Sequence, residues 1–311
     1  MISPFNVAPL FLPTSVDPVF PLTSLAETQC GRSLARSLVS RISIDERIVS
    51  CTPIELPICA LDVRRRVGQD AGVQSHGSAV YVLVHGGWSG AYGFRHVRRA
   101  LQSHGHEVFT PSLTGIGERV HLTNPQIDLS THVEDVVNMV LYEDLRDFVL
   151  LGFSYGGAVV TGTLDHIGSR IRELVYLDAF VPADGESVAG LAGRASAAGF
   201  DLGTVWLVPP PDRAFDDANE AAWQTARRVP HPMRCFAEPM RLSAPVEDHE
   251  FGLTYIKATA DGRDAPGGAA FWAAAEHAKS SDRWRYFEID TTHMVSSNRP
   301  DELAAILLPL A

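Results

Sequence analysis

Residues 152–157 read Gly-Phe-Ser-Tyr-Gly-Gly, directly after an apolar run at residues 148–152 and before a segment of helical periodicity, residues 157–166. A Gly-x-Ser-x-Gly sequence between a strand and a helix is typical of the sharp turn that presents a nucleophilic serine. Glycine two positions on either side removes the Cβ atoms that would clash in so tight a turn. The helix that follows points its N-terminus at the serine and favours negative charge there. The pattern predicts that Ser154 is a nucleophile; the alternative is a serine in an ordinary glycine-rich turn.

The chain on either side of this turn alternates between strand-like and helix-like segments. Short apolar runs predict strands at residues 79–84, 107–110, 148–152, 171–177, 253–258 and 284–289. Apolar residues at helical spacing predict helices at residues 94–103, 131–142, 157–166, 268–277 and 300–308. This alternation indicates an α/β fold, in which a mostly parallel, doubly wound sheet carries helices on both faces. Residues 181–250 interrupt the alternation and predict an inserted helical cap.

Residues 1–76 have a different character. The first two dozen are rich in proline and poor in charge, which favours an extended or disordered segment. A short helix is expected at residues 33–48 and a strand at residues 54–61. We therefore expect an N-terminal extension at residues 1–76, with a role in homodimer formation as one hypothesis, and an α/β domain at residues 77–311.

The composition restricts the partners and the compartment. Of the 311 residues, 45% are hydrophobic and 20% are charged, which is ordinary for a globular protein. The formal net charge of -11 argues against binding to nucleic acid or to anionic lipid. No apolar run reaches the ~18 residues that a membrane helix needs. No basic residue precedes Arg32, and prolines interrupt the N-terminal segment, so we expect a cytoplasmic location and no secretory signal.

A nucleophilic serine needs a histidine to accept its proton. His293 follows the predicted strand 284–289 and precedes the predicted helix 300–308, and it is the only one of the 12 histidines that has this position. We therefore assign it as the base. The other histidines show no metal-ligand spacing, so no metal site is expected.

The histidine in turn needs a carboxylate, which should follow a strand between the serine and the histidine in the chain. Asp261 comes directly after the predicted strand 253–258 and is the preferred residue. Asp264, three residues further on, is one alternative. Asp178, at the end of the predicted strand 171–177, is the other.

Backbone N–H groups should stabilise the oxyanion of the tetrahedral intermediate. One donor is expected to be Tyr155, which follows the nucleophile, and the other is expected in the turn after the first strand. Gly87 is preferred there, with its neighbours Gly86 and Trp88 as alternatives and as candidate substrate contacts. Aromatic residues near and in the cap either pack in its core or line a substrate pocket. The candidates for the pocket are Phe180, Trp206 and Trp223.

From about residue 79 to residue 308, the chain resembles the small α/β-hydrolase-fold esterases related to plant methylesterases and hydroxynitrile lyases. The resemblance rests on Val-Leu-Val-His-Gly-Gly-Trp at residues 82–88, Pro-Ser-Leu-Thr-Gly-Ile-Gly-Glu-Arg at residues 111–119, residues 152–157, Tyr-Leu-Asp-Ala-Phe-Val-Pro at residues 176–182 and Thr-His-Met at residues 292–294. It implies an acid at Asp261 and an oxyanion amide at Gly87. Phe153 stands where many relatives have histidine, and residues 1–76 have no counterpart.

The resemblance implies hydrolysis of a small carboxylic ester through an acyl-enzyme, without a cofactor. Hydroxynitrile lyases of this fold have a threonine and a lysine at the positions held here by Gly86 and Met294, which favours ester hydrolysis. The alternatives are hydrolysis of an amide, a lactone or a carbon–carbon bond on the same residues. A small-molecule binding protein without catalysis is a further alternative, because fold alone does not fix function.

Overall fold

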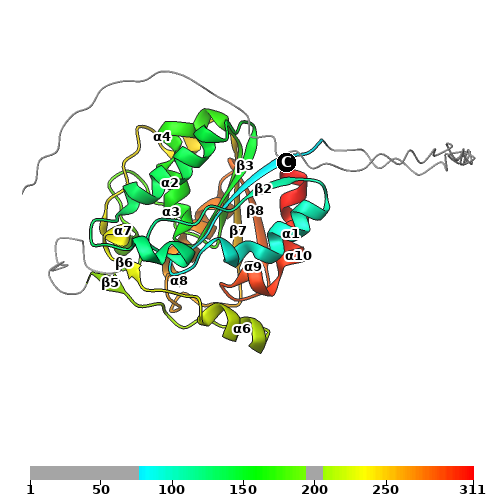
Figure 1. Cartoon of the computed structure of the whole chain (residues 1–311). Helices are drawn as coiled ribbons and strands as arrows, with labels where there is room; N and C mark the ends of the chain where they lie inside the picture. Colours follow the sequence, from blue (N-terminus) through cyan, green and yellow to red (C-terminus); the bar gives the residue numbers. More distant parts are fainter. Residues whose placement is uncertain (1–76, 194–205) are drawn as a thin grey trace, which may run out of the picture. The chain divides into compact units, whose positions relative to one another are not determined.

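A parallel sheet forms the centre of the computed structural model, which describes residues 77–193 and 206–311. Its six strands lie in the order β2-β1-β3-β4-β7-β8. Figure 1 shows the sheet between two layers of helices. The strands are β1 (Val80–Val84), β2 (Glu107–Phe109), β3 (Phe148–Phe153), β4 (Ile171–Leu177), β7 (Gly252–Ala258) and β8 (Trp284–Ile289). All pairings are parallel, and the predicted α/β fold is confirmed. The elements expected within residues 1–76 lie outside the described residues.

Helices cover both faces of the sheet. Neighbouring side chains of a strand point to opposite faces, and here both faces carry apolar side chains that must be buried. Val82 and Leu150 pack in a core with the helices Leu129–Tyr142, Gly156–Gly162 and Gly268–Ser280, whereas Leu83 and Leu151 pack in a core with the helices Arg95–Ser103 and Pro300–Leu307. Strands β1 and β3, to which these residues belong, contain no charged residue because both of their faces are covered. The long helices are α1 (Arg95–Ser103), α2 (Leu129–Tyr142), α3 (Gly156–Gly162), α8 (Gly268–Ser280) and α10 (Pro300–Leu307).

Shorter helical turns connect these elements. They are η1 (Ala91–Phe94), η2 (Gly117–Leu122), α4 (Leu164–Ile167), η3 (Gly168–Arg170), α9 (Val295–Asn298) and η6 (Leu308–Leu310). Within the described ranges, no helix has both the length and the apolar character that a bilayer crossing requires.

The segment between β4 and β7 leaves the sheet, where the sequence predicts a helical cap. Its described elements are α5 (Val188–Leu191), β5 (Leu207–Val208), α6 (Ala218–Thr225), β6 (His231–Pro232), α7 (Arg234–Ala237) and η5 (Val246–Asp248). Strands β5 and β6 pair antiparallel, a feature that the sequence analysis does not predict. Asp217 caps the N-terminus of α6, and its side chain accepts a hydrogen bond from the Glu220 N–H at 2.7 Å.

The turn from β3 into α3 requires its glycines for steric reasons. Ser154 has a φ of 57°, in the left-handed region that side chains other than glycine rarely adopt. A Cβ on Gly152 would lie 2.5 Å from the Gly156 carbonyl oxygen, and a Cβ on Gly156 would lie 2.6 Å from the Val84 carbonyl oxygen. Both neighbours are backbone atoms, one of α3 and one of β1, so neither can move without disturbing the helix or the sheet. Packing of the turn against β1 therefore fixes where the serine stands.

We expect Gly156→Ala to destabilise the fold by about 3 kcal/mol or more, because the added methyl group meets the backbone of β1 and not a mobile side chain. Urea unfolding followed by circular dichroism measures the change. Gly93→Ala is the control, because its Cβ would meet only the Ser89 hydroxyl, at 3.1 Å. Equal stability of the two variants would contradict this account of the turn.

Candidate active site

Ser154, His293 and Asp178 meet at the carboxyl edge of the sheet. Ser154 follows β3, Asp178 follows the neighbouring strand β4, and His293 follows β8. The His293 Nε2 atom lies 2.9 Å from the Ser154 Oγ atom, and its Nδ1 atom lies 2.7 Å from Asp178 Oδ2. A carboxylate only accepts hydrogen bonds, so the proton of the neutral imidazole belongs on Nδ1. Nε2 is then free to accept the serine proton.

The preferred assignment of the acid, Asp261, needs correction as far as contact with the imidazole is concerned. Asp261 accepts a hydrogen bond from the backbone N–H of His293 at 2.8 Å, and it does not bond the ring. Asp264 lines the nearby cavity. Asp178 was the sequence alternative, and it reaches the ring because β4 lies directly beside β3 and because its φ of 41° turns the chain sharply at the strand end.

Lys257 holds the second oxygen of Asp178. Its Nζ atom lies 2.7 Å from Asp178 Oδ1 and also donates to the Ala258 carbonyl, and both charged side chains are 1% exposed. Burial by itself would raise the pKa of Asp178, but hydrogen bonds from His293 and Lys257, with the Lys257 charge, lower it below its ordinary value. The carboxylate therefore stays ionised with one oxygen for each partner.

Two phenylalanine rings enclose the imidazole of His293. The Phe271 ring stacks on it with centroids 5.0 Å apart and an interplanar angle of 5°, and Phe153 lies on it at 4.7 Å. Burial of the imidazole, together with the positive charge of Arg213, lowers the pKa of His293 to about 4. The ring is consequently neutral, and able to act as a base, at physiological pH.

Of the two expected oxyanion donors, Tyr155 follows the serine in the chain, and Gly87 lines a small cavity together with the serine. Among the backbone hydrogen bonds of the described turns and loops, none uses the N–H of Gly87 or of Tyr155. The Trp88 N–H, by contrast, donates to His231 Nδ1 at 3.2 Å, so it is already occupied. The geometry therefore favours Gly87 over Trp88 as the second donor.

A cavity of about 350 Å³ opens at Ser154, and its wall is mainly apolar. Trp88 and Phe180, two of the predicted substrate contacts, lie in this wall. Gly86 lines a smaller cavity of about 20 Å³, whose wall also includes Ser154 and His293. A larger groove of about 680 Å³ runs along α8 and does not include the serine.

The remaining predicted contacts, Trp206 and Trp223, do not line either cavity next to the serine. The Trp223 ring lies between the guanidinium groups of Arg95 and Arg227, at 3.7 and 3.9 Å from the ring centroid. Trp206 accepts a backbone hydrogen bond from Met233. The Trp223 side chain therefore packs between α1 and the cap, in line with the other interpretation of such residues.

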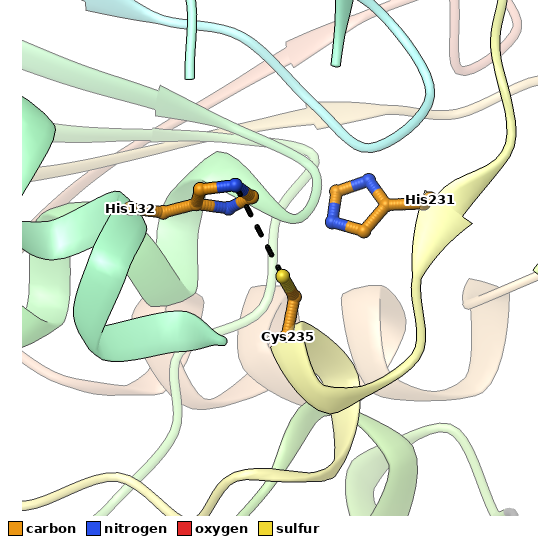
Figure 2. Close-up of side chains that lie close together, drawn as sticks. All are labelled: His132, His231 and Cys235. Carbon is orange, nitrogen blue, oxygen red and sulfur yellow. Dashed lines mark hydrogen bonds between the residues drawn. The ribbon is translucent and has the colours of Figure 1, made fainter. Parts of the chain in front are cut away.

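His132, His231 and Cys235 form a buried cluster behind the oxyanion turn (Figure 2). A histidine that binds a metal usually donates its second N–H to an acceptor. Here His231 Nδ1 accepts the Trp88 N–H, while His132 accepts from the Tyr155 hydroxyl and donates to the Thr114 carbonyl. Burial keeps both rings neutral, lowering the pKa of His132 to about 4. Both ring nitrogens of His132 are engaged in these bonds, and the cluster thereby supports Tyr155 and the turn.

Sequence reasoning missed Lys257, His231 and Arg213. Only Lys257 leaves a visible signal, because a lysine inside the otherwise apolar strand β7 must find a buried partner. His231 and Arg213 come from the cap, where the chain has no regular period that would say which side chains point toward the serine.

Comparison with known proteins places this chain in a family. The model of the alpha/beta hydrolase family matches residues 81–306. The carbendazim hydrolyzing esterase of Nocardioides sp. (strain SG-4G) is 35% identical over 249 residues, which cover 75% of this chain and 99% of that protein. The putative chloroplastic methylesterase 15 of Arabidopsis thaliana is 27% identical over 123 residues, 39% of this chain and 28% of that protein.

Among solved structures, an extracellular alpha/beta-hydrolase from a Paenibacillus species superposes with a TM-score of 0.61 at 24% identity. The match covers 75% of this chain and 99% of that one. The fold is thus shared over the whole described α/β domain, and the resemblance to α/β-hydrolase-fold esterases is confirmed. The chain belongs to the alpha/beta hydrolase family and is a hydrolase whose relatives include esterases.

Proposed function

We propose that the enzyme hydrolyses carboxylic esters through a covalent acyl-enzyme on Ser154. The observation that carries the proposal is the hydrogen-bonded series Ser154–His293–Asp178 at the base of a mainly apolar cavity. Such a series activates a serine for attack on an acyl carbon. The carbendazim hydrolyzing esterase of Nocardioides, which matches 75% of this chain over 99% of its own length, is named an esterase. This supports an ester as the substrate.

In the first half-reaction, His293 Nε2 takes the Ser154 proton while Oγ attacks the carbonyl carbon. The N–H groups of Gly87 and Tyr155 donate to the resulting oxyanion. His293, now an imidazolium, gives its proton to the leaving alcohol as the carbon–oxygen bond breaks. Asp178 accepts the Nδ1–H throughout and stabilises the transient positive charge without taking the proton.

In the second half-reaction, a water molecule takes the place of the alcohol. His293 accepts a proton from this water, which attacks the acyl carbon, and the proton returns to Ser154 Oγ when the acid is released. His293 and Ser154 are already hydrogen-bonded, so the transfers between them need no rearrangement, which is how positioning reduces the barrier.

We expect Ser154→Ala to lower kcat for 4-nitrophenyl acetate by about 10⁴-fold or more, because the nucleophile is lost. Release of 4-nitrophenolate, followed by absorbance, measures the rate, and carbendazim is a second substrate to try. Circular dichroism checks that the variant is folded. Wild-type turnover by a folded Ser154→Ala enzyme would refute the acyl-enzyme.

Asparagine substitutions distinguish the roles of the two carboxylates next to His293. Asp178→Asn removes the acceptor of the Nδ1–H, so we expect kcat to fall by about 10³- to 10⁴-fold. Asp261→Asn keeps an oxygen for the backbone N–H of His293, so its kcat should fall less than about tenfold. The assignment of Asp178 is wrong if Asp261→Asn is the more damaging change.

The pH dependence of kcat/KM should report the pKa of the His293 imidazole. His293 acts as a base only when it is neutral, above its pKa, so activity is lost as the pH falls through that value. Because the pKa of His293 is about 4, kcat/KM should hold at pH 5.5 and fall at lower pH. An acidic limb near the ordinary histidine value of ~6.5 in a folded enzyme would contradict the lowered pKa.

A further inference from the structure

Arg213 brings a positive charge to the cavity beside Ser154. The residue belongs to the cap between β5 and α6, and its side chain lines both the 350 Å³ cavity and the 20 Å³ cavity. The guanidinium donates one hydrogen bond, from Nη2 to the Pro266 carbonyl at 3.2 Å. It forms no ion pair with a carboxylate of residues 77–193 or 206–311. Most of its five N–H groups are therefore available to a ligand.

The other arginine of the cavity wall differs in this respect. Arg263 forms an ion pair with Glu276 on α8. Arg228, which lines the smaller cavity next to Arg213, resembles Arg213: its bond goes to the Pro211 carbonyl at 2.6 Å. The site thus gathers two guanidinium groups whose described hydrogen-bond acceptors are neutral.

The nearest acidic groups already have other partners. Asp178 binds His293 and Lys257, and Asp261 binds the backbone N–H of His293. Asp264, the acid in the cavity wall, is exposed to solvent and hence well screened. Burial and the charge of Arg228 lower the pKa of Arg213 to about 10, so the group remains a cation at neutral pH.

We propose that Arg213 binds a carboxylate of the substrate, so that the enzyme prefers esters that carry a negative charge. This inference rests on the proposed ester hydrolysis and names its substrate class. A planar guanidinium with free N–H groups matches a carboxylate through paired hydrogen bonds, and such bonds are strong where water is scarce. The rest of the cavity wall is mostly apolar, so the part of the substrate between ester and carboxylate is hydrocarbon or aromatic.

Matched pairs of esters test the proposal with the full-length enzyme. For a charge on the acyl side, 4-nitrophenyl hemiadipate is compared with 4-nitrophenyl heptanoate. For a charge on the alcohol side, 3-acetoxybenzoate is compared with 3-methylphenyl acetate. In at least one pair, the wild-type kcat/KM should favour the anionic ester by at least about tenfold. Arg213→Met should abolish this preference while it still hydrolyses the neutral ester.

Arg263→Met is the matched control, because Arg263 lines the same cavity but is already paired with Glu276. It should keep the preference for the anionic ester. The proposal is overturned if the wild type favours the neutral ester in both pairs. It is also overturned if Arg213→Met keeps the preference or if Arg263→Met removes it equally.

A binding measurement separates this proposal from the esterase proposal. Calorimetric titration of Ser154→Ala with 3-hydroxybenzoate, with 3-methylphenol as the neutral control, needs no turnover. Binding of the carboxylate that is at least about tenfold weaker after an added Arg213→Met change supports the arginine site, even if no ester is hydrolysed. Equal binding with and without Arg213, both of 3-hydroxybenzoate and of monomethyl adipate as the acyl-side carboxylate, overturns it, even if neutral esters are hydrolysed well.

Discussion

The buried carboxylate of Asp178 is the interaction on which the rest of the site depends. One of its oxygens holds the imidazole of His293 and the other holds the ammonium group of Lys257, all at the centre of the sheet edge. A buried charge is tolerated only when it is fully paired. With both oxygens engaged, the ring has one orientation, and its Nε2 atom faces Ser154.

The backbone of the sheet and the aromatic side chains supply the remaining constraints. Carbonyl groups of β1 and α3 leave no room for side chains on the glycines of the turn, so Ser154 is held in a left-handed conformation. Phe153 and Phe271 pack against the imidazole of His293, which is 3% exposed. Burial against these two rings keeps the imidazole neutral.

Much of this could be predicted from the sequence, because strand and helix periods are local and the Gly-x-Ser-x-Gly turn has steric requirements that residues reveal. The acid was harder, since Asp178 and Asp261 both follow strands and chain order does not say which carboxylate reaches Nδ1. Packing decides it, through the lysine in β7 that pairs with Asp178. Arg213 escaped prediction because the position of a cap side chain depends on tertiary contacts alone.

The central claim is that Ser154 becomes acylated, and mass spectrometry of the intact protein tests it most directly. The enzyme is mixed with 4-nitrophenyl acetate, quenched in acid within the first turnovers and digested with a protease. The account predicts one acetyl group per molecule, on the peptide that contains Ser154. An enzyme that turns over the ester with no adduct, or with the acetyl group on Cys235 or another residue, would contradict it.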